Sequence, residues 1–119
     1  MDDEEITNRI AEEILGLRKN GKYWMKNGII LYASERIPDW DNKTPPKLNP
    51  FDNLYHLQFV KNEVVKRWGS FNLAYHDHRD GCGNHYVFGI DSKGVEVVDE
   101  DEARAICIGT LQAVKNDKR

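Results

Sequence analysis

Residues 85–114 read HYVFGIDSKGVEVVDEDEARAICIGTLQAV, and this stretch shows the strand and helix patterns of the chain most clearly. Two β-type runs, 85–90 and 95–98, flank the Ser92-Lys93-Gly94 turn and predict an antiparallel pair. Asp99 with Glu102 three residues on resembles a capping box and predicts the start of a helix. The stripe that follows has clear helical spacing and comprises Ala103, Ile106, Cys107, Thr110, Leu111 and Val114.

The residues before this region predict a strand and, earlier, a second helix. Phe71, Leu73 and Tyr75 alternate with polar or small residues, and the turn at residues 79–84 leads this strand into the next one. Asn49-Pro50 supplies a cap and a first-turn proline, and Gly69 ends the helix. Its apolar stripe consists of Phe51, Leu54, Tyr55, Leu57, Val60, Val64, Val65 and Trp68.

The first third of the chain predicts a helix, a hairpin and a long loop. Apolar residues at helical spacing, preceded by an acidic cluster, predict a helix from Asp3 to Leu17. Residues 22–25 and 29–32 flank Asn27-Gly28, the pair that favours a two-residue hairpin turn. The prolines in residues 33–48 rule out a continuous helix or a central strand there.

The composition is that of one small globular domain spanning residues 1–119. Hydrophobic residues make up 39% and charged residues 31%, and no apolar run is long enough to cross a membrane. We expect an α+β fold, a single-domain α-β-α sandwich with three helices and a small, mostly antiparallel sheet in the order α-β-β-α-β-β-β-α. The acidic amino terminus lacks signal-peptide features, so we expect a cytoplasmic protein. The net charge of −3 argues mildly against a general nucleic-acid binder.

Three segments resemble the phage ABA-sandwich domain family of small phage and prophage proteins. They are Glu5 to Gly16, Asn49-Pro50 with the helix that ends Val64 to Trp68, and Glu102 to Cys107. The resemblance spans nearly the whole chain and implies the sandwich fold, a phage origin and the cytosol of a host bacterium. It implies no catalytic residue. The Pro45-Pro46 loop and the histidine cluster depart from the family's pattern.

That cluster consists of His76, His78 and His85. In an extended strand, His76 and His78 project to one side, and His85 can lie near them on the partner strand. Three imidazoles together can hold zinc with an open position for water. A solvated strand end, contact with a ligand and a zinc site are the alternatives; we take ligand contact as the prediction and assign no metal or cofactor.

Two irregular segments are candidates for anion binding. The glycines near Arg79 can let backbone amides approach an anion, although a hairpin turn alone also needs them. Trp40 can stack on a base while nearby cations hold phosphates, or it can anchor its loop to the core. Those cations are Arg36, Lys43 and Lys47. Trp24 and Trp68 lie within apolar patterns and are predicted to be core residues.

No catalytic set is assembled in the sequence. Cys107 lies on a buried stripe and Cys82 in a turn, with a Cys82–His85 nucleophile pair as a remote alternative; both thiols are expected to be reduced. We therefore expect a non-enzymatic phage accessory protein that sequesters a small anionic nucleotide-type immune signal, as a homo-oligomer. The alternatives are a protein-binding inhibitor of a host defence enzyme, as anti-CRISPR proteins are, and a zinc hydrolase built on His76, His78 and His85.

Overall fold

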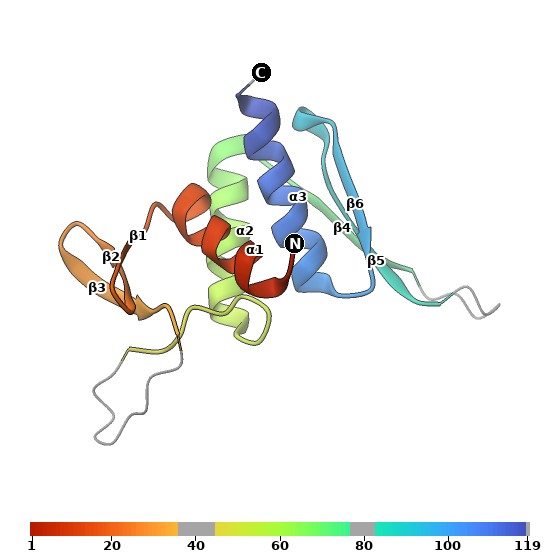
Figure 1. Cartoon of the computed structure of the whole chain (residues 1–119). Coiled ribbons are helices and arrows are strands. Elements are labelled where there is room, and N and C mark those ends of the chain that lie inside the picture. The colour runs from red at the N-terminus through yellow and green to blue at the C-terminus, as the bar shows by residue number, and fades with distance from the viewer. Residues whose placement is uncertain (36–44, 77–82, 119) are drawn as a thin grey trace.

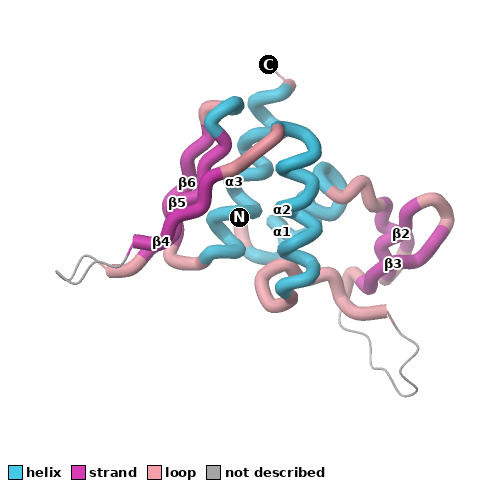
Figure 2. Tube along the Cα trace, turned by 180° about the vertical axis from the view of Figure 1, so that it is seen from behind, coloured by secondary structure: helices cyan, strands magenta, loops and turns pink. Residues whose placement is uncertain are grey.

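The computed structural model describes residues 1–35, 45–76 and 83–118. Three helices occupy the middle of the molecule, with one three-stranded antiparallel sheet on either side of them (Figures 1 and 2). The helices are α1 (Asp3–Arg9), α2 (Leu54–Trp68) and α3 (Glu102–Asp117). The first sheet contains β1 (Arg18–Asn20), β2 (Tyr23–Lys26) and β3 (Ile29–Ala33), and the second contains β4 (Asn72–His76), β5 (His85–Ile90) and β6 (Val95–Asp99). The α+β class and the predicted order of helices and strands are confirmed, with β1 as an addition.

The first helix is shorter than predicted. Asp2 is its N-cap, with a side chain that accepts a hydrogen bond from the Glu5 amide, and α1 continues as a π-helical turn over Ile10–Ile14. Gly16 then takes a φ of +67°, a left-handed conformation that ends the helix before the predicted boundary at Leu17. The chain enters β1 directly, a strand that sequence patterning missed because its three residues are all polar.

The predicted hairpin is confirmed. β2 and β3 pair antiparallel, and the two turn residues have positive φ angles of 54° at Asn27 and 78° at Gly28. A two-residue turn of this type requires positive φ at both central positions, which Asn-Gly tolerates best. The turn lies at the tip of the hairpin, which extends away from the helices (Figure 1).

The second helix starts later than Asn49-Pro50. Asn49 instead closes a turn of its own, because its side-chain oxygen accepts from the amides of Phe51 and Asp52. Asn53 is the true cap, accepting from the amides of Tyr55 and His56. The predicted end at Gly69 is confirmed, with a φ of +89°.

The third helix has its cap at Asp101 rather than Asp99. The Asp101 carboxylate accepts from the Arg104 amide at 2.9 Å, three residues on. Asp99 supports this cap, because its carboxylate accepts a hydrogen bond from the Asp101 amide and holds the capping residue in place. The predicted turn before β6 is confirmed as a short 3₁₀ segment, Asp91–Lys93, closed by Gly94.

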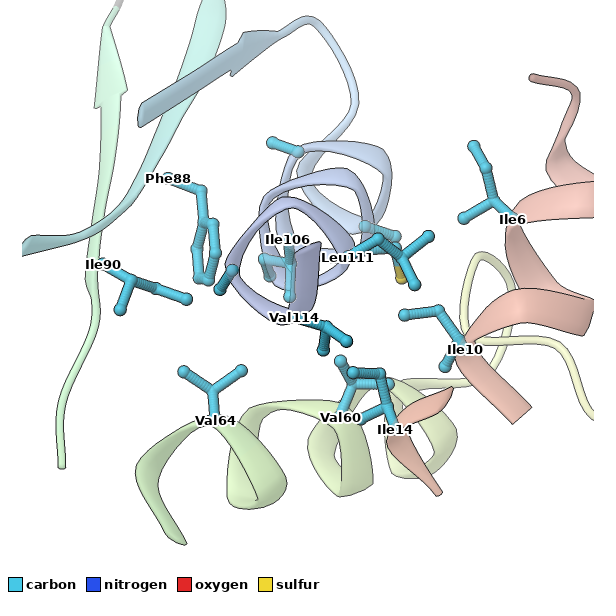
Figure 3. Packing of buried hydrophobic residues seen from close by; sticks show 14 of the residues in the cluster. Ile6, Ile10, Ile14, Val60, Val64, Phe88, Ile90, Ile106, Leu111 and Val114 are labelled. Atoms are coloured by element: carbon cyan, nitrogen blue, oxygen red, sulfur yellow. The ribbon is translucent and has the colours of Figure 1, made fainter. Parts of the chain in front are cut away.

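The main core lies among the three helices and the inner face of the second sheet. Side chains enter it from β5, from the first helix with its π-helical turn, and from α2, all converging on α3 (Figure 3). The labelled residues are Phe88 and Ile90, then Ile6, Ile10 and Ile14, then Val60 and Val64, around Ile106, Leu111 and Val114.

A smaller cluster holds the first sheet against the helices. It consists of Ala11, Leu17, Trp24 and Leu48. Trp24 is 1% exposed, which confirms its predicted core position. Trp68 packs at the edge of the main core, and its indole N–H donates to Asp117 at 2.8 Å.

Candidate anion-binding site

The first sheet carries a concentration of positive charge in an acidic chain. Residues 14–34 contain Arg18, Lys19, Lys22 and Lys26 and not one aspartate or glutamate. Since the whole chain has a formal charge of −3, this +4 segment leaves −7 on all the other residues. Such an asymmetry marks one end of the molecule as the place where an anion is attracted.

A hollow of about 560 Å³ lies where this sheet meets the end of the first helix. Its lining includes Gly16, Arg18, Lys19, Asn20, Lys26 and the Asn27–Gly28 turn. The volume falls within the range of about 300–1,000 Å³ that is usual for small-molecule sites. Three cations and no carboxylate line it, so the hollow suits an anion and not a metal cation.

Lys26 is tied to the helix end. Its ammonium donates to the backbone oxygen of Leu15 at 3.3 Å, and it lies 3.8 Å from the point that a Cβ on Gly16 would occupy. Gly16 therefore turns the chain, and because it has no side chain it leaves space beside the Lys26 ammonium. An ammonium has three N–H donors, so one bond to Leu15 leaves two for a ligand.

Lys19 and Arg18 lie on adjacent positions of β1. The Lys19 ammonium lies 5.9 Å from the centroid of the Trp24 ring, within the range of a cation–π contact. Arg18 pairs in register with Met25. Within the ranges that the structure describes, none of Arg18, Lys19 and Lys26 forms an ion pair, so their charge is not neutralised by a neighbouring carboxylate.

Lys47, a predicted ligand residue, lies in a different place. It is exposed and forms a parallel bridge with Ala33 at the end of β3. The hollow beside it, about 220 Å³, is also lined by four acidic residues, Asp3, Glu4, Asp52 and Asp101. These carboxylates make that hollow a poorer place for an anion than the cationic one.

The structure brings two of the predicted histidines together. His76 and His85 are register partners on β4 and β5, and their rings stack with centroids 5.1 Å apart and planes 8° apart. Tyr75 and Tyr86 form a second ring pair beside them, 4.9 Å apart. The described residues hold no group of three potential metal ligands, and His78, the third member of the predicted cluster, lies outside them.

The two predicted clusters do not meet. β3, which Lys47 joins, and the β4–β5 pair with its stacked histidines lie on opposite sides of the helices in both views (Figures 1 and 2). Arg36, Trp40, Lys43 and Arg79 lie outside the described residues, as does Cys82. Their predicted roles in ligand binding stay predictions.

The sequence did not predict the cationic hollow, because no motif indicates it. The sequence feature that points to it is a run of 21 consecutive residues, 14–34, without an acidic side chain. Cys107, in contrast, is buried as predicted, and burial together with the charges of Asp101 and Asp3 raises the pKa of its thiol to about 12. A thiol with that pKa is not a nucleophile at neutral pH.

Comparison of the chain with models of protein families, with curated proteins and with solved structures finds no match. Among the described residues, no helix is both long and apolar enough to span a membrane.

Proposed function

We propose that this chain is a non-enzymatic binding protein that takes up a small phosphate-bearing anion of nucleotide type in the cationic hollow of the first sheet. The observation that carries the proposal is the lining of that hollow, which includes Arg18, Lys19 and Lys26 and no carboxylate, and none of the three has an ion-pair partner among the described residues. Charge-assisted hydrogen bonds from such groups are the usual way in which proteins hold phosphate.

The sequence resemblance supplies the biological setting of the proposal. In a phage protein, uptake of a nucleotide-type immune signal would withdraw it from bacterial antiviral defence, and sequestration needs affinity without turnover. The proposed protein acts in the host cytosol as a homo-oligomer. Exposed strands and an exposed apolar helix face support the oligomer part.

The test is equilibrium dialysis of the full chain against pyrophosphate, a cyclic dinucleotide and ADP-ribose at low salt. We expect at least one nucleotide to bind and its affinity to fall steeply as sodium chloride is added, because exposed charge pairs are screened. Arg18→Gln and Lys19→Gln should each weaken binding by at least about tenfold, since a hydrogen bond to a charged group contributes about 1.5–3 kcal/mol.

Lys66→Gln is the matched control. Lys66 is an exposed lysine on α2 outside the hollow, so its substitution changes the net charge equally without touching the site. Equal losses in Lys66→Gln and Lys19→Gln would show only a long-range charge effect. Failure of all three probes to bind contradicts the proposal.

A protein-binding inhibitor of a host defence enzyme is the second candidate function. The observation that favours it is a set of large apolar side chains exposed on β3 and on the first turns of α2. Retention of a host enzyme by the purified protein, in the absence of nucleotide binding, would select this candidate.

A further inference from the structure

Large apolar side chains are exposed side by side along β3. Ile29, Ile30 and Leu31 are 61%, 47% and 40% exposed. Successive side chains of a strand point to opposite faces, so three exposed neighbours mean that neither face of the hairpin is fully covered at this point. A strand in this position leaves apolar surface in water on both sides.

The same surface continues onto α2. Leu54 and Tyr55 are 81% and 80% exposed in its first turn, and Phe59, one turn on from Tyr55, is 41% exposed. Seen from behind, α2 is the outermost helix, with the β2–β3 hairpin beside it (Figure 2). A hollow of about 280 Å³ joins the two elements, lined by Leu31 and Tyr32 on one side and Phe59 on the other, with the polar side chains Lys26, Asn62 and Glu63 also in its lining.

The six side chains expose a large apolar area in total, divided between the two faces of the hairpin and the first turns of α2. Their exposed parts amount to about 700 Å², taking about 200 Å² for each fully exposed side chain of this size. A total of this size approaches the roughly 800 Å² that each partner contributes to a standard interface.

We propose that a second copy of this chain covers this surface in a two-fold symmetric dimer. We call the surface the β3–α2 face and define it by Ile29, Ile30, Leu31, Leu54, Tyr55 and Phe59. This deepens the homo-oligomer part of the proposed function and does not depend on the ligand. Charge and shape both favour this occupant.

Charge favours self-pairing at β3. A two-fold axis brings like residues opposite one another, and β3 contains no charged residue from Ile29 to Ala33. β1, at the other edge of the same sheet, would oppose its own Arg18 and Lys19, which is unfavourable. Along Ile29–Leu31, no backbone hydrogen bond joins the outer edge of β3 to another segment that the structure describes.

Shape favours the same occupant. The β3–α2 face carries both a projecting apolar hairpin and a hollow with apolar side chains from both elements, so each copy offers a projection and a recess to its two-fold mate. Lys26 lines this hollow and also the cationic one. The dimer contact therefore borders the proposed anion site, and bound anions would lie near the subunit boundary.

The experiment measures the mass of the full chain in solution without nucleotide, by sedimentation equilibrium over a series of concentrations. We expect twice the 13.8 kDa mass of one chain for the wild type. Ile30→Lys and Tyr55→Lys should lower the measured mass to that of one chain at the same concentrations. Val98→Lys, at a comparably exposed position on β6, is the control and should stay dimeric.

Circular dichroism of each variant separates dissociation from unfolding. If Ile30→Lys loses its helical signal, Ile29→Lys, at the more exposed neighbouring position, replaces it. A wild type that stays at 13.8 kDa throughout the series overturns both the oligomer and the surface. A dimer that the lysine substitutions in β3 and α2 leave intact overturns the surface alone. Neither result bears on nucleotide binding, which is measured separately.

Discussion

The ammonium of Lys26 lies 3.3 Å from the backbone oxygen of Leu15, and this bond joins the β2–β3 hairpin to the end of the first helix. Lys26 thereby lies between two surfaces, the cationic hollow and the hollow of the β3–α2 face. The proposed ligand site and the proposed dimer contact are therefore neighbours that share one residue.

Replacing Lys26 tests its place in the site. Lys26→Met should weaken nucleotide binding by about tenfold, because a charged donor is lost, and should lower the unfolding free energy by less than about 1 kcal/mol, since the bond to Leu15 is exposed. Dialysis and urea unfolding measure the two effects. Lys66→Met serves as the control, and a Lys26→Met protein that binds like the wild type would remove Lys26 from the site.

Gly109 of α3 lies against the ring of Phe88 on β5. A Cβ at Gly109 would lie 2.7 Å from Cε1 of Phe88, closer than such contacts occur, and Phe88 is fully buried. Gly109→Ala should therefore destabilise the fold by about 1–3 kcal/mol, the usual cost of overpacking, despite the better helix propensity of alanine. Thermal unfolding measures it against Gln112→Ala on the exposed side of α3, which should change little.

Asn53 caps the N-terminus of α2. Asn53→Ala removes an acceptor for the Tyr55 and His56 amides and should cost about 1 kcal/mol, the typical effect of losing an N-cap. Asn62→Ala, which loses only an exposed bond from Gln58, is the comparison. Equal stability of the two variants in urea unfolding would contradict the assigned cap.

His56 should make stability depend on pH. It is 4% exposed, burial lowers its pKa below the usual 6.5, and its Nδ1 accepts from the Asn49 amide at 3.0 Å. Above about pH 6.5 the imidazole is neutral in both states, so its contribution is fully present. As the pH falls toward the lowered pKa, the unfolded chain takes up a proton that the folded chain excludes, and stability decreases.

Urea unfolding at a series of pH values from neutral to mildly acidic measures this dependence. His56→Gln removes the titrating group, so we expect a shallower loss of stability over the same pH interval than in the wild type. An identical pH profile for the two proteins would show that another group is responsible.

Sequence patterning predicted those elements whose signals are local. Asn27-Gly28 specifies its own turn, and Gly69 can take the positive φ that ends α2. Boundaries with two competing signals were placed wrongly, because Asn49 and Asn53 are equally good caps by composition and only the folded turn shows which amides each one reaches. The division of the strands into two sheets depends on long-range packing that no short pattern contains.

The candidate site was the least predictable part. The histidine pattern predicted that His76 and His85 lie close together, and their rings do stack, but no motif in the sequence indicates the hollow lined by Arg18, Lys19 and Lys26. Their sequence spacing is unremarkable, and they share a wall only because Gly16 turns the chain and β1 pairs with β2. Charge counting along windows of the sequence would have found the segment, though not the hollow.

The most direct test of the account is a titration of the isotope-labelled full chain with ADP-ribose and pyrophosphate, followed by amide chemical shifts. We predict that the largest shifts fall on Gly16, on Arg18–Asn20 and on Asn27–Gly28, the walls of the cationic hollow. Shifts confined to the β4–β5 end near His76 and His85, or no shifts with either probe, would contradict the central claim that this hollow binds a phosphate-bearing anion.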